Sequence, residues 1–167
     1  MKIPKIYLTG EINEKSYLEF CLSLDIIEMS NSKLVIIDIN SGGGCLVLGL
    51  ALYDRIKNCE LLTHTIGSGT VASSAILPYL AGQKRSLRPN CELLIHYVTV
   101  AVDGTIRQVS DAVKQVEKGI KKYKQIVVSE TNISNSQIDK LMKHDHYIQA
   151  NTAIDCKISH FITPKSF

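Results

Sequence analysis

Apolar runs alternate along the chain with segments in which apolar residues recur every three or four positions. The runs fall at 5–9, 33–39, 61–66 and 92–98. The run at 33–39 is nearly continuous in β-branched residues, as in a strand that is buried on both faces. Helical spacing occurs at 17–29, 46–57, 74–80 and 136–142. This alternation predicts an α/β fold with a largely parallel sheet, and nothing marks a domain boundary within residues 1–167.

The most pronounced helical pattern runs from residue 109 to residue 127. Seven apolar residues recur there at spacings of three and four, with charged residues between them: Val109, Ala112, Val113, Val116, Ile120, Tyr123 and Val127. The pattern predicts a long amphipathic helix with one apolar stripe that must be covered. Both the same chain and a neighbouring subunit are candidates for the cover, and the pattern does not decide between them.

Composition and charge exclude several classes of function. The chain is 45% hydrophobic and 21% charged, as in an ordinary globular domain, and its net charge is only +3. A small charge on dispersed basic residues argues against nucleic acid or an anionic membrane as a partner. No apolar run approaches the roughly 20 residues that span a bilayer, and no secretion signal is recognisable. The five cysteines lack metal-ligand spacing, so we expect free thiols in the cytoplasm and no metal or other cofactor.

Two clusters of small residues each join a predicted strand to a predicted helix. In the first, Gly42-Gly43-Gly44, unobstructed backbone N–H groups near a helix N-terminus suit a negative oxygen, although a flexible turn explains the same glycines. The second surrounds Ser73 and permits a tight turn that exposes a hydroxyl, although close packing also explains its small residues. Neither cluster has the spacing of a nucleotide-binding loop.

A base and an acid that suit a nucleophilic serine occur further along the chain. His96 lies near the end of the predicted strand at 92–98, and Asp145 follows a short predicted helix. A serine hydroxyl needs a base to take its proton, and the base needs a carboxylate to orient it. Ser73, His96 and Asp145 supply these groups, but other combinations in the chain do so too, and each residue also has an ordinary structural explanation.

Eight short motifs resolve this ambiguity, because they follow one another in a recognisable order between residues 6 and 150. They are Ile6-Tyr-Leu-Thr-Gly10, Ile39-Asn-Ser-x-Gly-Gly44, Leu52-Tyr-Asp54, Gly69-x-x-Ala-Ser73, Ala81-Gly82, Leu87-x-Pro-Asn90, Ile95-His96 and Asp145-x-Tyr147-x-x-Ala150. Each motif is weak alone. In order and spacing, the set resembles the proteolytic subunits of Clp protease, the ClpP family of serine peptidases.

The resemblance implies a fold and an assembly. The fold is the ClpP/crotonase-type spiral of repeated ββα units, in which the helix from Val109 forms a protruding handle. The assembly is a homo-oligomer of two stacked rings, heptameric in the family, with the active sites facing an inner chamber. An AAA+ unfoldase is the family's usual partner, and unfolded polypeptides or short peptides are its substrates.

The resemblance also assigns the catalytic residues of a serine endopeptidase. Ser73 corresponds to the nucleophile, His96 to the general base and Asp145 to the acid that orients it. The backbone N–H groups of Gly44 and Ser74 correspond to the oxyanion hole, and Gly43 lies beside them. No metal is implied.

The chain departs from the family's pattern at several positions. Gly42 replaces the usual proline, and Ser74 replaces the usual methionine after the nucleophile. Tyr97-Val98 and Val100-Ala101 replace residues that line the family's substrate cleft, so the peptide preference stays open. Asp38 replaces an aromatic residue of the surface where the unfoldase docks, and the chain begins almost at its first strand, without the family's N-terminal segment. The need for an ATPase partner is therefore left open.

Two other functions share parts of this pattern. A crotonase-type acyl-CoA enzyme has the same spiral fold and an oxyanion hole, but it does not need a serine, a histidine and an aspartate in these positions. A catalytically silent or scaffold subunit of a ClpP-type ring generally lacks one of the three residues. The presence of all three favours an active peptidase.

Overall fold

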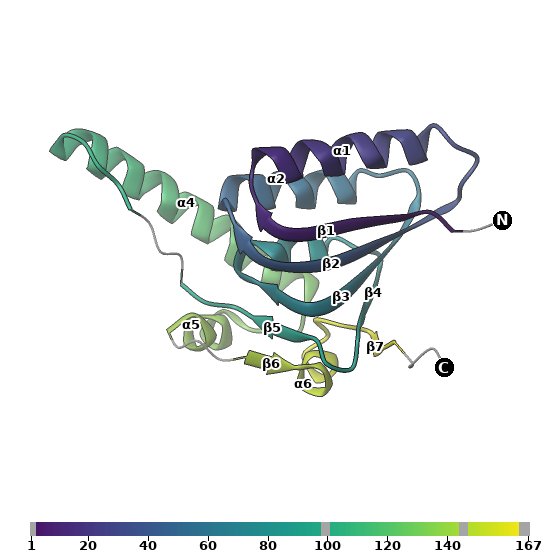
Figure 1. Ribbon diagram of the computed structural model, residues 1–167. Helices are drawn as coiled ribbons and strands as arrows, with labels where there is room; N and C mark the ends of the chain where they lie inside the picture. Colours follow the sequence, from purple (N-terminus) through teal and green to yellow (C-terminus); the bar gives the residue numbers. More distant parts are fainter. Residues whose placement is uncertain (1–2, 98–100, 144–146, 164–167) are drawn as a thin grey trace.

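The computed structural model describes residues 3–97, 101–143 and 147–163 of the chain (Figure 1). Strands and helices alternate, which confirms the predicted α/β class. In chain order the elements are β1 (Lys5–Ile12), α1 (Glu14–Glu28), β2 (Leu34–Gly44), α2 (Leu46–Lys57), β3 (Leu62–Ala72), the 3-10 turn η1 (Ser73–Ala75), α3 (Ile76–Leu80), β4 (Lys84–Leu87), β5 (Glu92–Leu94), α4 (Ile106–Glu130), α5 (Asn135–Lys143), β6 (Tyr147–Gln149), α6 (Ala150–Asp155) and β7 (Phe161–Ile162).

The sheet forks at β3. Its main path has the order β1-β2-β3-β4-β7, with parallel pairing along it. The first half of β3 pairs with β4, whereas its second half pairs in parallel with β5 and ends on the pair Ala72–Leu94. Parallel neighbours end at the same edge of a sheet. The fork therefore brings Ser73, directly after β3, close to His96, two residues after β5.

The hydrophobic core lies between this sheet and the helices that cover it. Helices α1 and α2 lie on one face of the sheet, and α5 and α6 lie beside β5 and β6 (Figure 1). The β-branched run of β2 places Ile37 and Ile39 in the core, where they are fully buried together with Leu24 of α1 and Leu52 of α2. Among the described residues, no helix is long and apolar enough to cross a membrane.

Helix α4 leaves the body of the domain, as predicted for the protruding helix. Its N-terminal half projects away from the sheet, whereas its C-terminal half packs on the body and buries Tyr123 and Val127 (Figure 1). Val113, on the projecting half, is 42% exposed. The apolar stripe is therefore divided: the same chain covers one end of it and leaves the other end open.

Arg85 of β4 fixes the packed end of α4. Its guanidinium donates to the carboxylate of Glu130 (3.2 Å), to the carbonyl oxygen of Glu130 (2.8 Å) and to that of Lys157 (3.0 Å). Arg85 is only 5% exposed, and an arginine at such a depth requires this kind of pairing. The last turn of α4 is thus held against the sheet.

Several elements differ from those expected from the sequence. β2 extends to Gly44 rather than ending at Ile39, and β3 extends to Ala72 rather than Ile66, because their parallel ladders continue through glycines that disfavour strands. β4, β6, α6 and β7 were not predicted; the three strands are only two to four residues long. The strand expected at 92–98 ends at Leu94, and residue 98 lies outside the described residues.

Candidate active site

Ser73 stands on a sharp turn between β3 and η1. Its φ is +55°, in the left-handed region that residues with a side chain rarely adopt, whereas Ala72 before it is extended. Strain of this kind occurs at functional sites, where the surrounding structure has to maintain it. The turn carries the Ser73 side chain, which is half-buried, to the wall of a cavity.

Gly43 packs directly against this turn. A Cβ atom at Gly43 would lie 2.7 Å from the carbonyl oxygen of Ala72, 2.7 Å from Cβ of Ser73 and 3.0 Å from the backbone nitrogen of Ser74. The Gly43 N–H donates to the Ser41 hydroxyl at 3.1 Å, and the φ of Gly43 is +95°. Only glycine permits both this backbone conformation and this approach.

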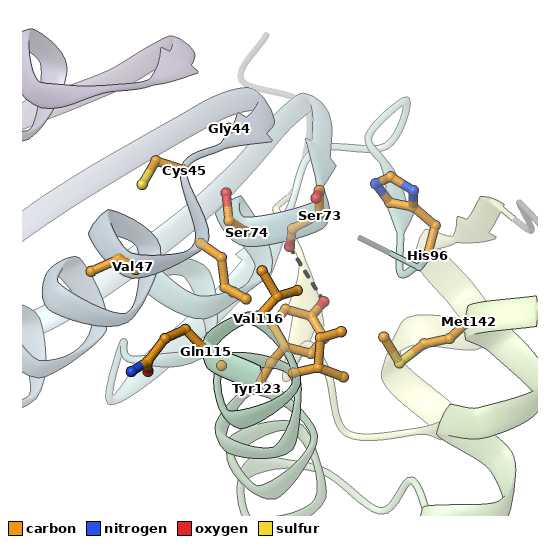
Figure 2. A pocket seen from close by; sticks show the side chains of 13 residues that line it. Gly44, Cys45, Val47, Ser73, Ser74, His96, Gln115, Val116, Tyr123 and Met142 are labelled. Atoms are coloured by element: carbon orange, nitrogen blue, oxygen red, sulfur yellow. Dashed lines mark hydrogen bonds between the residues drawn. The ribbon is translucent and has the colours of Figure 1, made fainter. Parts of the chain in front are cut away.

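His96 and Ser73 line the same cavity, which has a volume of about 360 Å³. In Figure 2 the imidazole, which is half-buried, faces the Ser73 side chain. The other lining residues come mainly from the start of α2 and from α4 and are mostly apolar: Gly44, Cys45, Leu46, Val47, Ser74, Gln115, Val116, Gly119, Ile120, Tyr123 and Met142. The structure thus places Ser73, His96, Gly44 and Ser74 around one cavity.

Asp145, the third residue of the predicted triad, lies outside the described residues. The described chain resumes at Tyr147 in β6, which pairs with Leu94 of β5. Leu94 is two residues before His96, so β6 begins beside the end of the strand that leads into the histidine. The assignment of Asp145 stays a prediction.

The sequence analysis assigned no role to the hydroxyl groups of two residues at this site. The hydroxyl of Tyr123 donates to the backbone carbonyl oxygen of Ser73 at 3.3 Å (Figure 2). The hydroxyl of Ser74 is buried and has no hydrogen-bond partner within the described part of the chain. The helical pattern identified Tyr123 only as a member of the apolar stripe, because periodicity shows which face of a helix is buried and not which atoms its side chains contact.

The arrangement fits nucleophilic acyl transfer. A hydroxyl on a tight turn, an imidazole beside it and backbone N–H groups at a glycine-rich loop are the parts that this chemistry requires. Within residues 3–97, 101–143 and 147–163, no group of three His, Cys, Asp or Glu side chains is placed to hold a metal ion.

Comparison with known sequences gives a consistent result. The Clp protease family model matches residues 1–160. The ATP-dependent Clp protease proteolytic subunit 2 of Treponema denticola is 30% identical over 154 residues, which cover 90% of this chain and 77% of that protein. The subunit of the same name from Treponema pallidum is 29% identical over 158 residues, which cover 93% of this chain and 79% of that protein.

Solved structures show the same similarity in three dimensions. ClpP1 from Listeria monocytogenes matches with a TM-score of 0.84 at 27% identity, over 97% of this chain and 92% of that one. The ClpP protease catalytic domain from Plasmodium falciparum matches with a TM-score of 0.83 at 30% identity, over 98% of this chain and 86% of that one. These matches confirm the predicted spiral fold.

Proposed function

Because the chain belongs to the Clp protease family, we propose that it is a serine endopeptidase with Ser73 as nucleophile, His96 as general base and Asp145 as the orienting acid. The observation that carries the proposal is the position of Ser73. Its strained turn faces a cavity that His96 also lines. A serine held only for close packing would have no need of this conformation.

The proposed reaction proceeds through an acyl-enzyme. His96 takes the hydroxyl proton as Ser73 Oγ attacks the carbonyl carbon, and the N–H groups of Gly44 and Ser74 bind the resulting oxyanion. When the tetrahedral intermediate collapses, the C–N bond breaks and the imidazolium gives its proton to the leaving amine. A water molecule then attacks the ester, with His96 again as the base, and releases the acid and free Ser73.

The cavity beside Ser73 suits an apolar side chain of the substrate. Val116, Ile120 and Met142 supply apolar walls, and the cavity is large enough for an aliphatic or aromatic side chain. We therefore propose that the enzyme cleaves after apolar residues in short peptides or unfolded polypeptides, which can thread an extended segment past the site.

Assembly into homo-oligomeric rings in the cytoplasm is part of the same proposal. On the projecting half of α4, Ile106 is 91% exposed and Val113 is 42% exposed. Because subunits of this family form rings, we propose that a second copy of the chain covers these apolar side chains.

At the surface where an unfoldase would dock, Asp38 is buried and accepts hydrogen bonds from Ser68 (2.5 Å) and Arg88 (3.0 Å). This polar cluster takes the place of the aromatic residue that the resemblance implies.

Peptide cleavage should therefore proceed without nucleotide. The chain has no nucleotide-binding loop, and hydrolysis of an accessible peptide needs no energy input. A fluorogenic tetrapeptide with an apolar residue before the scissile bond should be cleaved at the same rate with and without ATP, whereas a stably folded protein should resist. Cleavage only on addition of an unfoldase and ATP would contradict this prediction, and no cleavage under either condition would favour a silent subunit.

Neighbouring glycines should differ sharply in their tolerance of a side chain. Gly43→Ala forces a Cβ into the backbone of the Ser73 turn, so kcat should fall about 100-fold, as on loss of one oxyanion donor. Gly42→Ala is the matched control, because a Cβ there would meet no atom within 4 Å apart from those of its chain neighbours, and its kcat should stay within about threefold. Initial rates at saturating peptide measure both variants. Equal losses in the two would show that the turn does not depend on this contact.

A further inference from the structure

Tyr123 links the protruding helix to the backbone of the nucleophile. Its side chain is 4% exposed and lies beneath the Ser73 turn, and its hydroxyl donates to the Ser73 carbonyl oxygen at 3.3 Å (Figure 2). Burial raises the pKa of Tyr123, so the hydroxyl stays protonated and remains a donor near neutral pH. Tyr123 thus acts on a peptide group rather than on the reacting hydroxyl itself.

The peptide group that Tyr123 holds also contains the Ser74 N–H. The C=O and N–H of a trans peptide share one plane and point in opposite directions, and the described chain has no cis peptide bond. A donor that fixes the carbonyl of Ser73 on one side therefore fixes the direction of the Ser74 N–H on the other. That N–H is one of the two proposed donors to the oxyanion.

The orientation of this peptide group needs external support. Ser73 adopts a left-handed backbone conformation that its own side chain disfavours, so the turn depends on contacts that offset this strain. Other contacts confine it only partly: the Ile76 N–H of the same 3-10 turn also donates to the Ser73 carbonyl oxygen, Gly43 approaches the Ser74 nitrogen, and Gly49 of α2 approaches the Ser74 carbonyl oxygen. An oxyanion donor accelerates the reaction only when it is already aimed before charge develops.

We propose that Tyr123 is a positioning residue for catalysis, which aims the Ser74 N–H at the oxyanion by holding the Ser73 carbonyl. The proposal rests on the proposed peptidase function. It explains why a hydroxyl is present at a position that otherwise serves to bury apolar surface. The effect should be confined to the transition state, because a substrate carbonyl in the ground state carries little of the charge that the N–H stabilises.

The test compares two tyrosines whose hydroxyl groups form hydrogen bonds that involve α4: Tyr123 on α4 itself, and Tyr53, which donates to Glu130 of α4. Tyr123→Phe should lower kcat about tenfold, because the Ser74 N–H is kept but less well aimed, with KM within about twofold of the parent. A peptide boronic acid, whose tetrahedral adduct places an oxygen in the oxyanion hole, should bind about tenfold more weakly. Tyr123→Met, which lacks the hydroxyl but fills the space with a flexible apolar chain, should show the same separation of kcat from KM.

Tyr53→Phe is the matched control. The Tyr53 hydroxyl donates to the carboxylate of Glu130, the last residue of α4, at 2.7 Å. This variant therefore also loses a partly buried hydrogen bond that involves α4, but one that does not reach the Ser73 turn. It should keep the parent's kcat and boronate affinity. Melting temperature and elution volume, measured for each variant, separate a change in folding or assembly from a change at the site.

The outcomes separate this inference from the proposed function. Full activity in Ser73→Ala would overturn the peptidase assignment and the inference with it. An inactive Ser73→Ala together with a Tyr123→Phe variant whose kcat stays within twofold would overturn only the role of Tyr123. A higher KM at unchanged kcat in Tyr123→Phe would do the same, because it would show that the tyrosine shapes the cavity and does not aim the N–H.

Discussion

Replacing Ser73 by alanine should lower kcat for a peptide substrate by about 10⁴-fold or more, because no other group can form the acyl-enzyme. His96→Ala should cost a similar factor, and the double variant should be no worse than either single variant, since the two residues act as one unit. Steady-state kinetics with a fluorogenic peptide measures all three. Melting temperatures should stay close to the parent's, because both side chains are only half-buried.

Ser23→Ala supplies the control for Ser73→Ala. Ser23 lies on α1, and its hydroxyl donates to the carbonyl oxygen of Glu19 at 2.8 Å, away from the cavity. The same loss of a hydroxyl there should leave kcat unchanged. A Ser73→Ala enzyme whose kcat stays within tenfold of the parent would remove Ser73 from the nucleophile's role.

Carboxylates placed on the open end of α4 should dissociate the assembly. In Val109→Asp/Val113→Asp, two charges would be buried where another subunit covers this stripe. Each buried charge would cost about 2 kcal/mol or more of the free energy of association. The variant should therefore elute as a smaller species in size-exclusion chromatography with light scattering. Val116 and Ile120 are unsuitable for this test, although they belong to the same stripe, because both line the cavity beside Ser73.

A control on the opposite face of α4 separates an interface effect from a charge effect. Lys114→Gln/Lys118→Gln lowers the net charge by two, as the valine-to-aspartate pair does, at positions that are exposed. This variant should keep the parent's size. If the aspartate variant also keeps it, or if the parent is a monomer, α4 is not the site of assembly.

Local patterns in the sequence were sufficient to predict much of this fold. The apolar spacing at 46–57 matches α2 in both bounds, and the β-branched run at 33–39 lies within β2 except for its first residue. Both signals depend on residues close together in the chain. The fork at β3 depends instead on which strands pair, and strands as short as β5 and β6 carry too few residues to show it.

At the candidate active site too, features that depend on local sequence could be predicted, and contacts between distant segments could not. Ser73 and the glycines at 42–44 were found because small residues at strand–helix turns are visible in sequence, and the ordered motifs connected them to His96. The contact from Tyr123 to the Ser73 carbonyl was not visible, because it joins residues 50 positions apart through one hydroxyl. The partners of Asp38 were missed for the same reason, since Ser68 and Arg88 reach it from other segments.

Labelling with a serine-directed fluorophosphonate shows whether Ser73 is an activated nucleophile, because such probes react only with a hydroxyl that a base has activated. We expect one adduct per chain, located on Ser73 and not on Ser74 by fragmentation of the digested peptide, and none in Ser73→Ala. An unlabelled parent that is folded and assembled, or an adduct that survives in Ser73→Ala, would contradict the claim that Ser73 is the nucleophile of a peptidase.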